Sequence, residues 1–298
     1  MTVADALRVC TLAALVIVAG QVQAQEEVEI TTQRLSDTVS VLFGQGGNIG
    51  VSAGSDGVFI IDDQFAEYTD DIRAAIATIS DQPIRYVINT HWHFDHAGGN
   101  ENFGKAGSVI IAHDNVRKRM VTGGLIRVVD VDVPPAPHEA LPVITFSNTL
   151  TLHLNGEEVQ LLHMDAAHTD GDGVVWFRGS NIIHTGDVFI NGIYPLADPD
   201  SGGSFDGIIS AVETILAMID DETQIIPGHG PITGKAGLQA YRDMCIALQK
   251  KIAGMKKSGM SLEEVLAAAP TADFDDKWNA WGENWITVSV QSFYEDAP

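Results

Sequence analysis

Cysteine and basic side chains are scarce in this chain. The 298 residues include two cysteines, and 17 lysines and arginines stand against 40 aspartates and glutamates, which gives a net charge of -23. A surface of this sign repels phosphate backbones and anionic lipid. Nucleic-acid processing and membrane-surface binding are therefore disfavoured, and we expect a small-molecule substrate.

Near its start the chain has an apolar run, but one too short to span a membrane. The run TLAALVIVAG (11–20) falls below the roughly 20 residues that a bilayer requires. It follows Arg8, and Val22 and Ala24 stand at the -3 and -1 positions of a signal-peptidase site. We interpret residues 1–24 as a cleaved secretory signal, which predicts a periplasmic or secreted protein without a stable membrane anchor. Cys10 leaves with the signal, so Cys245 has no intrachain disulfide partner.

The remaining residues, 25–298, fit a single large domain. Short strand-like runs at 28–35, 39–44, 48–54 and 57–63 are separated by glycine and serine turns, a pattern typical of an antiparallel meander. A helical pattern (66–80) and a buried strand (83–90) follow. The second half has the same order: strands within 151–187, a helix at 205–219, a strand at 224–229, and mostly helical sequence from 235 onward. The proline-rich segment 131–142 is predicted to be a seam between halves or a surface loop near the site.

The chain lacks a GxSxG elbow and a glycine-rich nucleotide loop, so serine or nucleotide-cofactor chemistry has no support. It has instead the cluster HWHFDH. His91 and His93 are two residues apart, so on extended backbone their rings point to the same side, while Asp95 and His96 follow at the turn. Without a metal, so many adjacent imidazoles would be buried without partners. The cluster therefore predicts a metal site.

Three further polar residues each follow an apolar strand-like run: His168, Asp187 and His229. With the cluster they supply five histidines and two carboxylates, which is enough for two zinc ions that share one aspartate. A single histidine is more often structural than a ligand, and we assign the other five to that class: His113, His138, His153, His163 and His184.

The order of these residues resembles the metallo-β-lactamase superfamily over nearly all of the mature chain. The resemblance implies an α/β fold, a four-layer αββα sandwich with the metal site at one end. It also implies two Zn²⁺ per chain, with Asp187 as the bridge. The first ion would be held by His91, His93 and His168, and the second by Asp95, His96 and His229. Asp62 falls where the family keeps a carboxylate behind the ligand loop, so its expected role is to orient that loop; a turn residue is the alternative.

The resemblance implies hydrolysis of an activated acyl bond by a zinc-bound hydroxide that Asp95 orients and whose proton it shuttles. His93 favours zinc over the iron of the flavodiiron branch, which usually has a carboxylate there. Exported β-lactamases fit the signal and the length, so a β-lactam amide is one implied substrate. Their best-known subclass has cysteine at position 187 and, at 190, a lysine that receives the drug's carboxylate; this chain has Asp187 and Ile190.

Other activities remain open: a lactonase, thioesterase or phosphodiesterase on the same fold, or a metal-binding envelope protein without hydrolytic activity. Side chains near the ligands are candidates for the substrate pocket, although aromatics at such places more often pack in the core. The candidates are Trp92, Phe94, Phe189, Ile190, Tyr194 and Leu196. Residues 44–48 (GQGGN) are either a flexible flap over the site or an ordinary turn.

Overall fold

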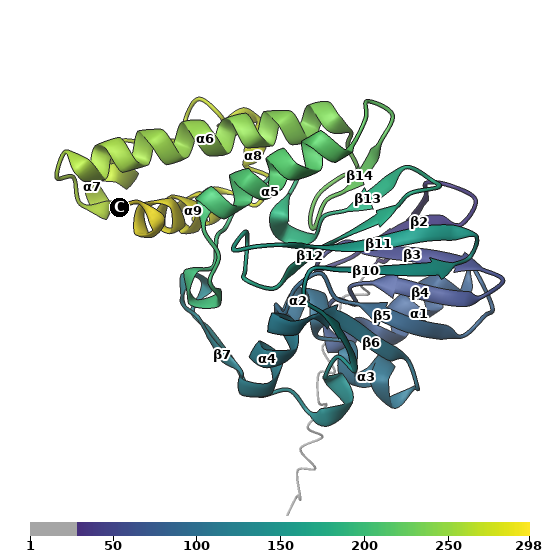
Figure 1. Cartoon of the computed structure of the whole chain (residues 1–298). Coiled ribbons are helices and arrows are strands. Elements are labelled where there is room, and N and C mark those ends of the chain that lie inside the picture. Colours follow the sequence, from purple (N-terminus) through teal and green to yellow (C-terminus); the bar gives the residue numbers. More distant parts are fainter. Residues whose placement is uncertain (1–28) are drawn as a thin grey trace, which may run out of the picture.

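The computed structural model describes residues 29–298, and the predicted signal at 1–24 lies outside the described residues. Two β-sheets lie face to face, with helices on the outer side of each (Figure 1). The helices are α1 (Thr69–Ala77), α2 (Phe94–Ala97), α3 (Asn100–Lys105), α4 (Asp114–Thr122), α5 (Phe205–Met218), α6 (Lys235–Lys257), α7 (Leu262–Ala267), α8 (Asp275–Trp278) and α9 (Glu283–Asp296).

The first sheet has seven strands in the order β1-β2-β3-β4-β5-β6-β9. They are β1 (Thr31–Arg34), β2 (Val39–Phe43), β3 (Ile49–Gly54), β4 (Gly57–Ile61), β5 (Ile84–Ile88), β6 (Val109–His113) and β9 (Ile144–Phe146). Strands β1 to β4 pair antiparallel, which confirms the predicted meander. From β4 to β9 the pairs are parallel, so these strands end at the same edge of the sheet.

The second sheet has five strands in the order β10-β11-β12-β13-β14. They are β10 (Thr149–Leu154), β11 (Glu157–Met164), β12 (Asp172–Phe177), β13 (Ile182–His184) and β14 (Gln224–Ile226). Three of the pairs are antiparallel, and β13 and β14 are parallel because α5 connects them. The strands predicted within 151–187 and at 224–229 are confirmed.

Alternation along β4 shows how the first sheet is buried on both faces. Phe59 and Ile61 point inward and pack with Phe177 and other side chains of the second sheet. Val58 and Ile60 point outward and pack against Ile72 of α1 and Phe103 of α3. Because successive side chains of a strand point to opposite faces, a continuous apolar run is what a strand between two layers needs.

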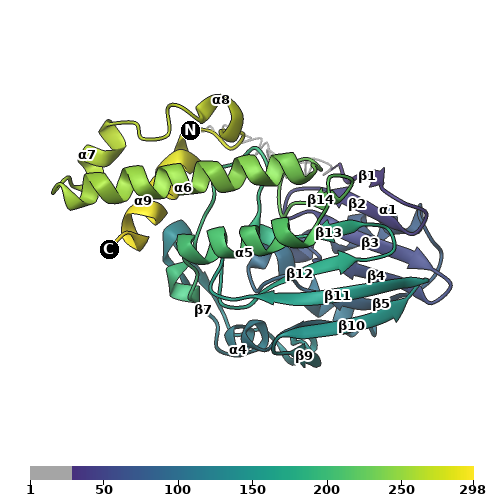
Figure 2. The ribbon, with the colours of Figure 1, turned by 45° about the horizontal axis from the view of Figure 1, so that its top comes forward.

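The outer face of the second sheet packs against the helices of the C-terminal part of the chain. Val174, Ile183 and Ile225 pack in one cluster with residues of α5, α6 and α9. Figure 2 shows α5 and α6 lying along this face, with α7, α8 and α9 beyond them. The predicted αββα sandwich is confirmed, as are the helical patterns at 205–219 and 235–257. Within residues 29–298, no helix has the length and apolar character needed to cross a bilayer.

Residues 131–142 form a surface loop beside the site. Strand β8 (Val131–Val133) pairs with β7 (Gly124–Ile126) in a small antiparallel hairpin, and the two strands are joined by a turn of 3-10 helix (Arg127–Val129). Ala140 and Ile126 pack with Trp92 of the ligand loop, so this segment abuts the candidate metal centre. Of the two predictions for this segment, the surface loop is the one that the structure shows.

Candidate metal centre

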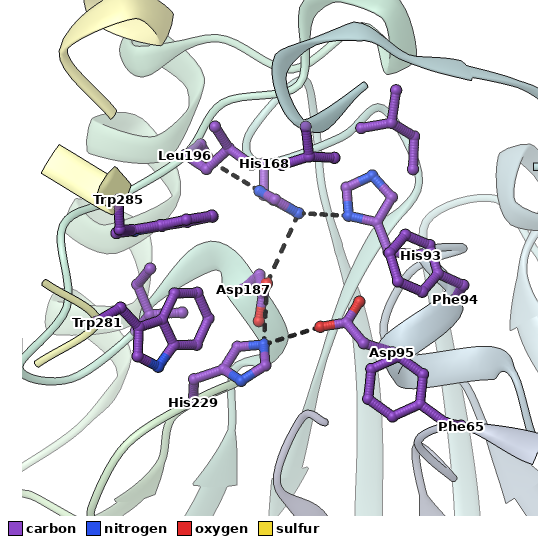
Figure 3. Close-up of a pocket in the computed structure, with 13 residues that line it drawn as sticks. Phe65, His93, Phe94, Asp95, His168, Asp187, Leu196, His229, Trp281 and Trp285 are labelled. Atoms are coloured by element: carbon purple, nitrogen blue, oxygen red, sulfur yellow. Dashed lines mark hydrogen bonds and ion pairs between the residues drawn. The ribbon is translucent and has the colours of Figure 1, made fainter. Parts of the chain in front are cut away.

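All seven predicted ligand residues meet at one end of the sandwich. His91 follows β5, and His93 immediately precedes α2, which carries Asp95 and His96. The other three residues follow strands of the second sheet: His168 after β11, Asp187 after β13 and His229 after β14. Figure 3 shows five of the seven pointing toward one another: His93, Asp95, His168, Asp187 and His229. Strand ends thus supply rigid supports for side chains that lie far apart in the sequence.

His91, His93 and His168 form one triad, in which potential ligand atoms of the three lie within 4.8 Å of one another. Nε2 of His168 is 2.9 Å from Nδ1 of His93. The remaining ring nitrogens are bonded outside the triad: Nδ1 of His168 donates to the carbonyl of Leu196 at 2.7 Å, and Nε2 of His93 donates to Asp198 at 3.0 Å. These outer bonds fix the tautomers, so both facing nitrogens present lone pairs to the same point.

Asp95, His96 and His229 form a second triad. Nε2 of His96 is 3.1 Å from Nε2 of His229, and Oδ2 of Asp95 is 3.2 Å from the same His229 atom. Asp187 lies between the triads and groups separately with His91 and His96. Its carboxylate oxygens are 3.2 Å from His96, 3.6 Å from His229 and 3.8 Å from His168. Asp187 therefore has the position that a bridging ligand requires.

Buried atoms without partners indicate what is needed to complete this arrangement. Nε2 of His91 is buried and makes no hydrogen bond, although Nδ1 of the same ring is paired with Thr90. Oδ1 of Asp187 is also buried without a hydrogen bond, although it lies 3.2 Å from His96. A buried polar atom without a partner is costly. The donor set of imidazole and carboxylate groups suits zinc, so these residues fit the metal that the sequence predicted.

The two triads differ in their proton affinity. Burial, together with the neighbouring imidazoles, lowers the pKa of His91 well below its usual value and that of His168 to about 4. At the second triad burial also opposes protonation, but Asp187 and Asp95 outweigh it and raise the pKa of His229 to about 9. The same carboxylates raise the pKa of His96. Without metal, protons therefore reside at the second triad, while His91 and His168 of the first triad are neutral and ready to bind a cation.

Asp62 orients the ligand loop. It is fully buried, with a left-handed φ of 63° at the end of β4. One carboxylate oxygen accepts the backbone N–H of Thr90 at 2.7 Å, and the other lies 2.8 Å from Nδ1 of His96. The sequence left Asp62 open between an orienting residue and a turn residue. The structure places it as a support of a ligand imidazole.

Residues 44–48 are held in place from two sides. The N–H of Gly47 donates to the carbonyl of Asp95 at 2.9 Å, and Gln64 donates to the carbonyl of Gly47 at 2.6 Å. A Cβ at Gly47 would lie 2.2 Å from the ring of His96, so only glycine permits this approach. Of the two possibilities for this segment, a flap or an ordinary turn, these contacts favour a turn that packs beneath the second triad.

Next to the triads lies an apolar cavity of about 150 Å³. Among the sequence candidates, Phe94, Ile190 and Leu196 line it, whereas Phe189 and Tyr194 pack in the core. Trp92 is also buried, and its indole N–H donates to Ser201. Five further lining residues were missed by sequence reasoning, because no spacing relates them to the ligands. They are Phe65, Ile126, Val129, Trp281 and Trp285.

The five histidines that the sequence left out of the site lie apart from the two triads. His113 and His163 stack on each other with ring centroids 3.7 Å apart. His184 is buried in β13 and donates to the carbonyl of Asn48 at 3.0 Å. His138 and His153 are exposed. None of the five belongs to a potential metal-binding group among residues 29–298.

An αββα sandwich with two groups of histidine and aspartate side chains at one end is the architecture of metal-dependent hydrolases. The chain belongs to the metallo-β-lactamase superfamily, whose family model matches residues 43–230. This range begins in β2 and ends just after His229, so it includes all seven candidate ligands. A probable metallo-hydrolase of Bacillus subtilis, YqgX, is 22% identical over 153 residues, which are 49% of this chain and 69% of the relative.

Solved structures share the fold at low sequence identity. A metallo-β-lactamase from Pontibacter korlensis is 16% identical with a TM-score of 0.63, over 73% of this chain and 99% of that one. The DIM-1 metallo-β-lactamase is 18% identical with a TM-score of 0.59, over 74% of this chain and 99% of its own. The sec-alkylsulfatase Pisa1 from Pseudomonas sp. is 16% identical with a TM-score of 0.64, over 89% of this chain but 50% of the sulfatase.

Proposed function

We propose that this protein is an exported dizinc hydrolase that cleaves an activated acyl bond of a small molecule. The observation that carries the proposal is the pair of triads with Asp187 between them; within each group of three the potential ligand atoms lie within 4.8 Å of one another. Membership of the metallo-β-lactamase superfamily and similarity to a probable metallo-hydrolase support the hydrolytic class. Export rests on the signal-like residues 1–24.

When bound, two zinc ions supply a Lewis acid for the substrate oxygen and a water molecule that ionises near neutral pH. The protein holds the ligands rigid for this purpose. Asp198 fixes the ring of His93, and the carbonyl of Leu196 fixes His168. Asp62 does the same for His96. Preorganised groups of this kind need no rearrangement during the reaction.

Asp95 is the proposed catalytic carboxylate. Its side chain is 21% exposed, lines the apolar cavity and reaches His229 with Oδ2 at 3.2 Å. Burial raises the pKa of this carboxyl, but His96 and His229 outweigh that effect and lower it to about 2. The carboxylate is therefore ionised at neutral pH, so it can accept a hydrogen bond from an attacking water and orient it.

The test is hydrolysis by the purified mature protein with and without a chelator. The panel contains a chromogenic cephalosporin, a lactone, a thioester, a phosphodiester and p-nitrophenyl carboxylic esters. We expect chelator-sensitive turnover of at least one acyl substrate, restored by zinc, and a loss of about 10²–10⁴-fold in Asp95→Asn. Turnover that survives chelation, or that is unchanged in Asp95→Asn, would contradict the proposal.

The second candidate is a metal-binding envelope protein without hydrolytic activity. The exposed carboxylate of Asp95 beside the cavity disfavours it, because a closed structural zinc site has no need of an open position. Zinc binding without turnover of any member of the panel would support this candidate over the hydrolase. For export, the test is N-terminal sequencing of the protein from a bacterial periplasm, which we expect to begin at Gln25.

A further inference from the structure

We infer that the substrate carries an uncharged apolar group of about six carbons or one phenyl ring on the acyl side of its scissile bond. This inference rests on the proposed function and specifies the substrate class of the same site. It follows from three properties of the cavity next to the triads: its apolar walls, the lack of lysine and arginine in those walls, and its size.

The cavity has two aromatic walls on either side of the ligands. Trp281, just before α9, and Trp285, in the first turn of α9, lie on one side, and Phe65 and Phe94 lie on the other (Figure 3). The ring of Trp281 contacts His229 with centroids 4.9 Å apart and Trp285 with centroids 4.6 Å apart. Aliphatic side chains complete the lining: Ile126, Val129, Ile190 and Leu196. An apolar group placed here is removed from water on most sides.

The residues that line the cavity include no lysine or arginine to receive a carboxylate. A second, wider groove of about 780 Å³ meets the cavity at His229 and Trp281, which line both. Among the described residues that line the two, Lys277 is the only lysine or arginine, and Asp275 and Asp276 are its neighbours in the groove. A carboxylate buried in the apolar cavity would lose its hydration without an ionic partner.

One basic residue near the apolar cavity is already paired. Arg127 follows Ile126 in the chain, but its guanidinium bonds to the carboxylate of Asp200 and so is not free to bind a substrate anion. This distinguishes the cavity from a β-lactamase site that holds the drug's carboxylate with a lysine. Sulfate monoesters and carboxylated β-lactams would have to rely on the metals for charge neutralisation. An uncharged ester or lactone does not have this requirement.

The size of the cavity sets the size of the group. An apolar cavity of about 150 Å³ accommodates benzene, and the cavity here has about 150 Å³. In the reaction, water adds to the acyl carbon, the bond from that carbon to the leaving oxygen breaks, and the leaving oxygen takes a proton. The products are a carboxylic acid that keeps the apolar group and an alcohol. The wide, open groove beyond Trp281 can hold the leaving group.

The test compares acyl groups on one leaving group in the zinc-loaded protein. The substrates are p-nitrophenyl acetate, p-nitrophenyl hexanoate and the mono-p-nitrophenyl ester of adipic acid, which has the six-carbon chain but ends in a carboxylate. We expect kcat/KM to rise by about tenfold or more from acetate to hexanoate, because each buried methylene contributes. We expect the adipate ester to fall below the hexanoate by a similar factor.

Variants of the walls show whether the cavity causes these preferences. Trp281→Ala and Trp285→Ala should each reduce the hexanoate-to-acetate ratio of kcat/KM, while Trp281→Phe retains it. The ratio cancels any effect of Trp281 on the zinc ligand His229. Trp281 is 44% exposed, so its substitution does not disturb a closed core. Val129→Lys should narrow the gap between hexanoate and adipate, and Val129→Met is the uncharged control that leaves this gap open.

The inference and the proposed function fail in different ways. Chelator-sensitive turnover with equal kcat/KM for all three esters, or with the adipate preferred, overturns the inference but leaves the hydrolase. If no acyl substrate is turned over, tryptophan fluorescence still tests the cavity with uncleaved amides. Saturable binding of hexanamide, weakened in Trp281→Ala and absent for adipamic acid, supports the inference. No binding of hexanamide, or equal binding of both amides, overturns it.

Discussion

Oδ2 of Asp62 lies 2.8 Å from Nδ1 of His96, and this contact joins the end of β4 to the second ligand triad. The other oxygen of Asp62 accepts the backbone N–H of Thr90, the residue before His91. A single buried carboxylate thus fixes the ring of one candidate ligand and the backbone next to another. Supports of this kind tune metal affinity although they do not contact the metal.

Replacing Asp62 should therefore weaken zinc binding. We expect Asp62→Asn to lower the affinity of the second triad for zinc by about 10–100-fold, because the amide cannot hold the ring of His96 as an ionised carboxylate does. Competition with a chromophoric chelator measures this change. Asp70→Asn, at an exposed position of α1, is the matched control and should bind zinc as the unmodified protein does. Equal affinity of the two variants would show that Asp62 has no such role.

Removing a ligand should lower metal content and stability together. In His91→Ala the first triad loses the ring whose Nε2 has no other partner, so we expect at least about one zinc equivalent to be lost and the melting temperature to fall. His153→Ala, on exposed strand β10, is the control and should change neither quantity. Mass spectrometry for metal and calorimetry measure the two effects. Two full equivalents in His91→Ala would refute its assignment as a ligand.

Zinc loading should release protons at the second triad. Below pH of about 9, His229 is protonated in the metal-free protein because nearby carboxylates raise its pKa, and His96 is shifted in the same direction. The lowered pKa values of His91 and His168 keep those rings neutral at pH 7. The affinity of the second triad for zinc should thus increase with pH between pH 6 and 8. For each proton that zinc displaces, we expect an increase of about tenfold per pH unit.

Calorimetric titration of metal-free protein with zinc, in buffers of different ionisation enthalpy, measures this release. We expect a binding event, at the second triad, whose apparent enthalpy depends on the buffer. If both events are independent of the buffer, the second triad is not protonated before metal binds, and the charge distribution described for it is wrong.

The stacked pair of His113 and His163 should make the protein sensitive to mild acid. Burial and the adjacent imidazole lower the pKa of His113, so the folded protein keeps this ring neutral where the unfolded chain is protonated. Stability is then lost as pH falls below about 6.5, the unfolded value. We expect a smaller drop in melting temperature between pH 7 and 5 for His113→Gln than for the exposed control His138→Gln. Equal drops would contradict this.

Local patterns in the sequence predicted the strands and the candidate ligands, and the resemblance to the superfamily implied the four layers. Phe59 and Ile61 alternate with Val58 and Ile60 in an unbroken apolar run, which indicates a strand covered on both faces. The ligand cluster is confined to six residues, and the three remaining ligands each follow an apolar run. The fold then brings these strand ends together at one end of the sandwich.

The pocket walls and the outer supports could not be predicted, because they depend on contacts between distant segments. Trp281 reaches His229 across 52 positions of sequence, and Asp198 reaches His93 across 105. No periodicity or spacing relates such pairs. The short strand β9 and the β7–β8 hairpin were also missed. The sequence left a flap and an ordinary turn open at 44–48 for a similar reason, because the partners Asp95 and Gln64 are contributed by other segments.

The most direct test of the two-metal centre is the zinc content of the purified mature protein, measured by inductively coupled plasma mass spectrometry after dialysis against metal-free buffer. The two triads and the shared Asp187 predict two equivalents per chain. A zinc content of one equivalent or less in Asp187→Ala would accord with a bridge that both zinc ions share. A wild-type protein that retains no zinc, or that saturates at one equivalent with excess zinc, would contradict the account.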